Sequence, residues 1–113
     1  PQAVPVRAQH GMVSTAQHLA TDVGVNILKQ GGNAVDAAVA VGYALAVVEP
    51  CCGNIGGGGF MLIRFANGTT TFINFRETAP RTSKTSLFLD KQGKPIPDAM
   101  NHSYLAVATP GTV

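Results

Sequence analysis

The sequence predicts an α+β fold with two consecutive helices followed by one β-hairpin. Apolar residues recur at three- and four-residue spacing between residues 16 and 28, and a second, almost wholly apolar run covers residues 34–48. Two short runs of branched and aromatic residues then flank an Asn-Gly pair. The first two patterns are typical of helices and the third of a hairpin. With 113 residues, 45% of them hydrophobic, the chain has the length of one ordinary domain.

The first helix is expected to follow a short extended segment that ends at Ser14 or Thr15, either of which can act as its N-cap. Its apolar side consists of Ala16, Leu19, Ala20, Val23, Ile27 and Leu28. Polar residues occupy the other side, so one face of this amphipathic helix should lie on a core. Gly31 and Gly32 are expected to end it.

The second helix is predicted over residues 34–48, with Asn33 as N-cap and Asp36 in the first turn, where a carboxylate complements the helix dipole. It ends before Pro50. This segment is apolar on almost every side, but its fifteen residues fall short of the roughly 20 that cross a bilayer. We therefore expect no membrane span and a buried core helix, whose Ala residues and Gly42 allow a neighbouring layer to approach closely.

The hairpin is predicted from residues 60–65 and 69–75, which are rich in aromatic and branched side chains. Between them, Asn67 and Gly68 suit the positive φ angles of a tight primed turn. Beyond the hairpin we expect one helical turn at 85–89, a turn-rich linker at 90–98 and an extended stretch from residue 101 onwards.

These elements leave most of their apolar surface without an opposing layer, which indicates missing partner sequence. The charged fraction is 12%, against a typical value of roughly 25%, and this favours a segment surrounded by other protein. Residues 1–113 are therefore expected to be the N-terminal segment of a larger domain and not an independent domain. Because the chain begins at Pro1, a leader has been removed or is not included.

Charge and ligand spacing exclude several classes of function. The net charge is only +2 and the eight basic residues are scattered, so nucleic acid is not an expected partner. His10, His18 and His102 have no recognised metal-ligand spacing with one another or with the cysteines, so no metal is expected. Cys51 and Cys52 are neighbours, and since a bridge between adjacent cysteines would be strained, they are interpreted as small buried apolar residues.

Four consecutive glycines, Gly56, Gly57, Gly58 and Gly59, suggest two interpretations. Backbone amides of glycine loops can bind phosphates. Nucleotide-binding loops, however, lead from a strand into a helix, whereas this loop leads from a helix into a strand, and it lacks a GKS or GKT sequence. A loop that passes tightly between packed layers, where a Cβ would clash, is at least as well supported.

Arg76 lies where a strand is predicted to end and a loop to begin, a common place for binding residues. Its guanidinium can bind a carboxylate through two nitrogens, or it can pair with Glu77, Asp90 or another acid. The chemistry of the chain leaves these alternatives about even. Glu77 is interpreted as a structural partner of Arg76. No residue stands out as a general base. The sequence also contains no GxSxG, HExxH or cysteine-histidine signature.

Four motifs together resemble one family. The runs ILKQGGNAVDAAVAVGYALAVVEP, GNIGGGGFMLIRF, INFRETAP and ATPGTV are similar, in order and spacing, to the consecutive N-terminal motifs of gamma-glutamyltranspeptidases. The similarity extends over roughly Val6 to Val113. It implies part of an N-terminal-nucleophile hydrolase αββα sandwich, made as a precursor that cleaves itself into a large and a small subunit, with this chain at the start of the large one.

The resemblance also implies a reaction. The new N-terminal threonine of the small subunit attacks the γ-amide carbonyl of glutathione or a related compound, and water or an acceptor amine then takes the γ-glutamyl group. No cofactor is implied. Because such a nucleophile uses its own α-amine as base and must begin a chain, no catalytic residue is expected in this chain, which starts with Pro1. Members of the family also imply a periplasmic or secreted location.

Site residues follow from the same resemblance. Arg76 matches the family arginine that binds the α-carboxylate of the γ-glutamyl group, and this favours a binding role over a purely structural one. Gly56 to Gly59 and Glu77 are expected near the active site, with packing as the first role of the glycines. Two enzymatic alternatives share the fold, a glutaryl or cephalosporin acylase and a poly-γ-glutamate depolymerase. A non-enzymatic alternative is an independent binding module.

Overall fold

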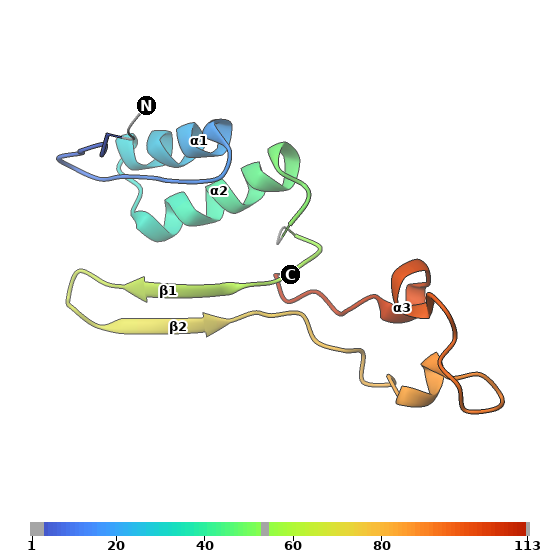
Figure 1. The fold of residues 1–113 in the computed structure, drawn as a ribbon. Helices are drawn as coiled ribbons and strands as arrows, with labels where there is room; N and C mark the ends of the chain where they lie inside the picture. The colour runs from blue at the N-terminus through green and yellow to red at the C-terminus, as the bar shows by residue number, and fades with distance from the viewer. Residues whose placement is uncertain (1–3, 53–54, 113) are drawn as a thin grey trace. The chain divides into compact units, whose positions relative to one another are not determined.

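The computed structural model describes residues 4–52 and 55–112 and divides the chain into two compact units, Pro1–Ile55 and Gly56–Val113. The first unit contains two helices, α1 (His18–Lys29) and α2 (Ala34–Val48). The second contains the antiparallel strands β1 (Phe60–Arg64) and β2 (Thr70–Asn74), followed by the short helix α3 (Ala99–His102). Figure 1 shows these elements along the chain. The predicted α+β composition is confirmed, with α3 as an additional short helix.

Helix α1 begins two to three residues later than predicted, because Gln17 and not Ser14 or Thr15 is its N-cap. The Gln17 side-chain oxygen accepts a hydrogen bond from the Leu19 amide at 2.7 Å. The Thr15 hydroxyl instead donates to the Gln17 carbonyl at 2.6 Å and pairs with the Thr21 hydroxyl at 2.7 Å. These bonds fix the turn before the helix. Thr15 is therefore not the cap, but its hydroxyl holds Gln17, which is the cap, in position.

The end of α1 is as predicted. Gly31 has a φ of 91°, in the left-handed region, and its amide bonds to the Leu28 carbonyl at 3.1 Å. The Gly32 amide bonds to the Ile27 carbonyl at 3.0 Å. This pair of bonds is a Schellman motif, which satisfies carbonyls that the helix leaves without an intrahelical partner.

Helix α2 matches the predicted bounds and cap. The Asn33 side-chain oxygen accepts from the amides of Val35 (2.7 Å) and Asp36 (3.1 Å), and the Asp36 carboxylate accepts from the Asn33 amide at 2.8 Å. This reciprocal arrangement is a capping box. It holds the start of α2 close to the end of α1 and so gives the two helices a short, defined connection.

The two helices pack most closely at Gly24, which is buried. A Cβ placed there would lie 2.8 Å from side-chain methyl carbons of both Val13 and Val41. Glycine therefore lets α1 approach α2 and the extended segment before α1 at one point. In the part of the chain that the structure describes, the buried hydrophobic residues of this unit are Ala20 and Ala37.

The burial predicted for α2 is not reached within this chain. Tyr43 is 65% exposed and Val47 is 79% exposed. Among the described residues, no helix is both long enough and apolar enough to span a bilayer.

The interpretation of the two cysteines is wrong. Cys51 and Cys52 are joined to each other in a disulfide, and both residues are exposed. They lie in the turn that follows the end of α2, and this turn brings the neighbouring sulfurs together without an apolar layer above them. Hydrophobicity of the residue type suggested burial, but both cysteines are exposed in the turn after α2.

The hairpin is confirmed, with a register that pairs Phe60 with Asn74 and Arg64 with Thr70. Its turn differs from the predicted primed type. Among the non-glycine residues that the structure describes, only Asp98 has a positive φ, so Gly68, at 85°, is the one turn residue in the left-handed region. The Gly68 amide bonds to the Phe65 carbonyl and the Phe65 amide to the Thr69 carbonyl, both at 2.9 Å. This is the bonding of a three-residue hairpin loop with a glycine bulge.

Residues after the hairpin form short turns. The predicted helical turn is present as a 3-10 turn over Thr85–Phe88, and an antiparallel bridge between Leu89 and Pro95 closes the linker. The prediction of an extended stretch from residue 101 is wrong at its start, where α3 ends and a second 3-10 turn, Tyr104–Ala106, follows. The Ser103 hydroxyl connects these turns, since it donates to the Ala99 carbonyl at 2.5 Å and accepts from the Leu105 amide at 3.2 Å.

Candidate functional site

The candidate site lies in the second unit, where three backbone segments meet. The glycine loop (residues 56–59) precedes β1, the arginine segment (residues 75–78) follows β2, and the return segment (residues 109–112) comes back to both of them (Figure 1). Gly59 and Phe75 exchange two backbone hydrogen bonds, of 3.2 and 3.0 Å, which extend the hairpin pairing by one residue pair. Two further bonds, of 3.2 and 2.8 Å, join Thr78 to Thr109. The arginine segment is therefore tied to a neighbour on each side of Arg76.

The glycine loop and the return segment are also bonded to each other. The Gly57 carbonyl accepts from the Gly111 amide at 3.0 Å, from the Thr112 amide at 3.3 Å and from the Thr112 hydroxyl at 3.1 Å. Three donors on one carbonyl oxygen fix the return segment over the loop. The arginine segment is therefore bonded to both the glycine loop and the return segment, and these two segments are also bonded to each other.

Two glycines leave no space between these segments. A Cβ on Gly58 or on Gly111 would overlap the carbonyl oxygen of Phe75. The predicted packing role of the glycine loop is supported at this position. The nucleotide-binding alternative gains no support, because the loop leads into β1 and its backbone contacts are with protein.

Arg76 is 65% exposed at its side chain, although its backbone is closely held. The Arg76 amide donates to the Asn74 side-chain oxygen at 3.1 Å. The Arg76 Nε lies 3.2 Å from the Glu77 Oε2, and the Glu77 side chain is 30% exposed. The predicted structural pairing with Glu77 is therefore present, while Asp90 instead binds the amides of its own turn, those of Gln92 and Lys94.

The ion pair uses one part of the guanidinium. Among residues 4–52 and 55–112, the contact with Glu77 through Nε is the ion pair that Arg76 makes, and the two terminal nitrogens have no acidic partner there. Arginine can bind a carboxylate with those two nitrogens in a fork. Structural pairing and substrate binding, which the sequence left as alternatives, are thus compatible in this geometry.

Sequence reasoning missed the role of Gly111. The motif that contains it, ATPGTV, served only as part of the family resemblance. A Pro-Gly pair at 110–111 indicates a turn, but it does not indicate which backbone lies against the glycine. That contact depends on pairing between segments that are far apart in the sequence.

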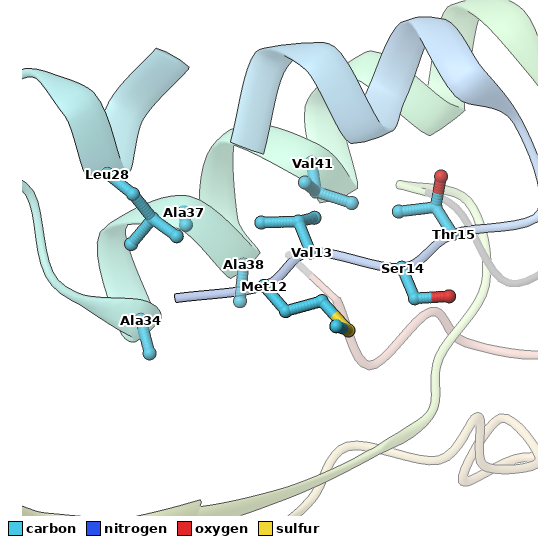
Figure 2. A pocket seen from close by; sticks show the side chains of 9 residues that line it. All are labelled: Met12, Val13, Ser14, Thr15, Leu28, Ala34, Ala37, Ala38 and Val41. Atoms are coloured by element: carbon cyan, nitrogen blue, oxygen red, sulfur yellow. The ribbon is translucent and has the colours of Figure 1, made fainter. Parts of the chain in front are cut away.

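A hollow of about 300 Å³ lies in the first unit, and Figure 2 shows it between the helices and the segment before α1. Its lining consists of Met12, Val13, Ser14, Thr15, Leu28, Ala34, Ala37, Ala38 and Val41. These side chains are apolar except for two hydroxyls, and no titratable group is among them. In the described part of the chain, no group of three or more histidine, cysteine, aspartate or glutamate residues could hold a metal ion. The arginine segment therefore remains the candidate site.

The fold and the site define a class of protein, an α+β chain in which the segment after a strand carries an exposed arginine paired with the adjacent glutamate. The sequence model of the gamma-glutamyltranspeptidase family matches residues 20–113. The chain therefore belongs to the gamma-glutamyltranspeptidase family, and the resemblance inferred from the four motifs is confirmed.

Individual relatives agree with this assignment. The chain is 62% identical over 109 residues to glutathione hydrolase proenzymes of Pseudomonas sp. (strain A14) and of Escherichia coli (strain K12), in each case over 96% of this chain. It also matches the crystal structure of Helicobacter pylori gamma-glutamyltranspeptidase, at 48% identity and a TM-score of 0.88, over 96% of this chain and 32% of that one. This structural match confirms the predicted N-terminal-nucleophile hydrolase fold. The chain spans 19% of the length of the two proenzymes.

Proposed function

We propose that this chain is the N-terminal segment of the large subunit of a gamma-glutamyltransferase, and that Arg76 binds the α-carboxylate of the γ-glutamyl substrate. The enzyme would cleave the γ-glutamyl amide of glutathione and related compounds and transfer the acyl group to water or to an acceptor amine. The relatives named glutathione hydrolase proenzymes support this substrate class.

The geometry of Arg76 is the observation that carries the proposal. Glu77 holds the guanidinium through Nε, and the side chain is 65% exposed, so its terminal nitrogens are accessible to a carboxylate from outside the chain. A charge-assisted, two-nitrogen contact fixes both the position and the direction of the bound group. Since the α-carboxylate and the reacting amide are at opposite ends of the γ-glutamyl group, anchoring one end directs the other towards a nucleophile.

The nucleophile in this proposal is the N-terminal threonine of a small subunit made from the same precursor. Its hydroxyl oxygen forms a bond to the γ-carbonyl carbon, and its own α-amine takes the hydroxyl proton. Collapse of the tetrahedral intermediate breaks the C–N bond while the α-ammonium returns the proton to the leaving amine. This leaves a γ-glutamyl ester, which water or an acceptor amine then cleaves. Residues of this chain take part only in binding, and the reaction as proposed uses no cofactor.

Processing and location are parts of the same proposal. The word proenzyme in the names of the relatives supports a precursor, and an N-terminal threonine nucleophile requires a cleavage that exposes it. We propose that this cleavage is autocatalytic and that the mature enzyme is periplasmic or secreted. The segment of residues 1–113 is proposed to fold as part of that larger domain.

The test compares kcat/KM for γ-glutamyl-anilide and glutaryl-anilide with the processed full-length protein. The two compounds share the terminal carboxylate and differ only in the α-amino group. A strong preference for the γ-glutamyl compound is expected, because a transferase site binds both α-substituents. Equal or reversed preference would indicate an acylase. Faster cleavage of poly-γ-glutamate than of either anilide would indicate a depolymerase, and no turnover would favour a binding module.

A further inference from the structure

We infer that Gly58 and Gly111 are positioning residues for substrate binding, because together they hold the backbone of Arg76 from two sides. The inference rests on the proposed role of Arg76 in binding the α-carboxylate. In the proposed function the guanidinium of Arg76 contacts the substrate carboxylate. The further inference is that Gly58 and Gly111 determine the position of that guanidinium.

Gly111 lies directly against the peptide group that links Phe75 to Arg76. A Cβ on Gly111 would overlap the carbonyl carbon and oxygen of Phe75 and would lie 3.0 Å from the Arg76 carbonyl oxygen. Real Cβ atoms do not approach backbone atoms this closely, so even alanine would force the two segments apart. The Gly111 amide is fixed at the same time by its 3.0 Å bond to the Gly57 carbonyl.

Gly58 limits the same peptide from the glycine loop. A Cβ there would overlap the Phe75 carbonyl oxygen and would lie 2.8 Å from the Glu77 amide nitrogen and 3.0 Å from the Glu77 Oε2. That carboxylate oxygen is the one that pairs with the Arg76 Nε. A side chain at Gly58 would therefore move both the backbone of the arginine segment and the acid that orients the guanidinium.

The exposure of Arg76 makes this backbone control important. Because its side chain is 65% exposed, packing within the described chain does little to fix the guanidinium, and its position depends on the Cα and on Glu77. A misplacement of about 1 Å in a substrate-positioning group can reduce a rate about 100-fold. A small displacement of the Phe75–Arg76 peptide would thus lower kcat/KM for carboxylate-bearing substrates, and because Arg76 is proposed to bind the carboxylate, we expect the loss chiefly in KM.

The test uses Gly58→Ala and Gly111→Ala in the processed full-length enzyme, with Gly11→Ala as the matched control. Gly11 gains the same methyl group, but its Cβ would meet only Leu28, at an ordinary 3.4 Å. Each variant is assayed with γ-glutamyl-anilide and with 4-aminobutyryl-anilide, which is the same compound without the α-carboxylate. We expect each glycine variant to lose about tenfold or more in kcat/KM for γ-glutamyl-anilide, chiefly through KM, and about twofold or less for the analogue. Equal losses for both compounds would overturn the inference.

A double-mutant cycle separates positioning from general damage. If the glycines act through the guanidinium, Gly111→Ala should cause almost no further loss in an Arg76→Ala background. Additive losses would overturn the inference while leaving the proposed function intact. If Arg76→Ala itself retained a normal KM for γ-glutamyl-anilide, the proposed role of Arg76 would fail first.

A milder variant covers the case in which the alanine substitutions prevent folding. Thr112→Val keeps the shape of the side chain and removes the hydroxyl that donates to the Gly57 carbonyl at 3.1 Å. Loss of this one bond should loosen the return segment and raise KM for γ-glutamyl-anilide by about two- to tenfold, with less change for the analogue. An unchanged KM in a correctly processed Thr112→Val enzyme would contradict the inference.

Discussion

At Arg76, different atoms of the guanidinium are available for the ion pair with Glu77 and for the proposed contact with a substrate carboxylate. Nε faces Glu77 at 3.2 Å, which restrains rotation of the planar group. The terminal nitrogens can then bind a carboxylate as a fork whose direction is already set. A lysine at this position would provide one compact charge and could not serve both partners in the same geometry.

Arg76→Lys should therefore severely reduce activity. We expect kcat/KM for γ-glutamyl-anilide to fall by about 30-fold or more, because removing or distorting a close charge pair to a bound group costs about 2 to 5 kcal/mol. Steady-state kinetics of the processed enzyme measure the effect. Arg64→Lys, at the exposed end of β1, serves as the control and should behave like the unmodified enzyme. Near-normal KM and kcat in Arg76→Lys would contradict the proposed binding role.

The residue scale also shows how far sequence reasoning extends. Arg76 is proposed as a binding residue because its motif resembles a family pattern and because strand ends commonly present binding residues. Its pairing with adjacent Glu77 could be anticipated, since only one peptide bond separates them. The close approach of Gly111 to Phe75 could not, because it depends on tertiary pairing between residues 36 positions apart in the numbering.

Helix α2 is the element that the sequence predicted best, and its cap explains why. Asn33 and Asp36 are three residues apart and satisfy each other's backbone amides without help from any other part of the chain. The cap of α1 was misplaced because the hydroxyl of Thr15 found partners at Gln17 and Thr21. The Thr15 hydroxyl accepts from the Gln17 amide and the Gln17 side chain accepts from the Leu19 amide, so the cap is formed two residues further along the chain than predicted for Thr15.

Removal of the cap gives a prediction for this element. Asn33→Ala should reduce the free energy of unfolding by about 1 kcal/mol, because the amides of Val35 and Asp36 lose their acceptor. Urea denaturation of the processed protein, or its thermal midpoint where unfolding is irreversible, measures the change. Asn33→Asp retains an acceptor oxygen and should remain close to the original stability. Equal destabilisation by both substitutions would contradict the prediction that the side-chain acceptor at residue 33 stabilises the helix.

The hairpin illustrates a different limit. Its strands and the presence of a turn were predicted from composition, but the turn type was not, since a three-residue loop and a two-residue primed turn both accept an Asn-Gly pair. The Asn67 side-chain oxygen accepts from both the amide and the hydroxyl of Thr69, at 3.0 and 2.7 Å. Both bonds come from Thr69, the residue that follows Gly68, and they are present in the three-residue loop.

At the scale of the whole chain, the small size of the core is the main feature. Across the described residues the buried hydrophobic side chains are Ala20, Ala37 and Ala99, while many larger ones are exposed. Alanine burial contributes little free energy compared with burial of leucine or phenylalanine. The apolar α2 therefore gains little free energy from burial against the described part of this chain.

Expression of residues 1–113 alone should give a chain that aggregates or unfolds without cooperativity. Circular dichroism during a urea titration and amide hydrogen exchange measure this directly, and we expect a broad transition and little protection beyond the two helices. The full-length processed protein is the reference and should unfold cooperatively. A monomeric segment with a sharp transition and strong protection in the hairpin would favour the independent module instead.

The bond from the Thr112 hydroxyl to the Gly57 carbonyl joins residues 55 positions apart, and this separation has a consequence for synthesis on the ribosome. At about 5 to 20 residues per second, roughly 3 to 11 seconds pass between translation of Gly57 and of Thr112. The hairpin can close within microseconds of emerging. Arg76 lies 36 positions before Thr112, so roughly 2 to 7 seconds separate their translation, and the bonds made by the return segment can form only after this delay.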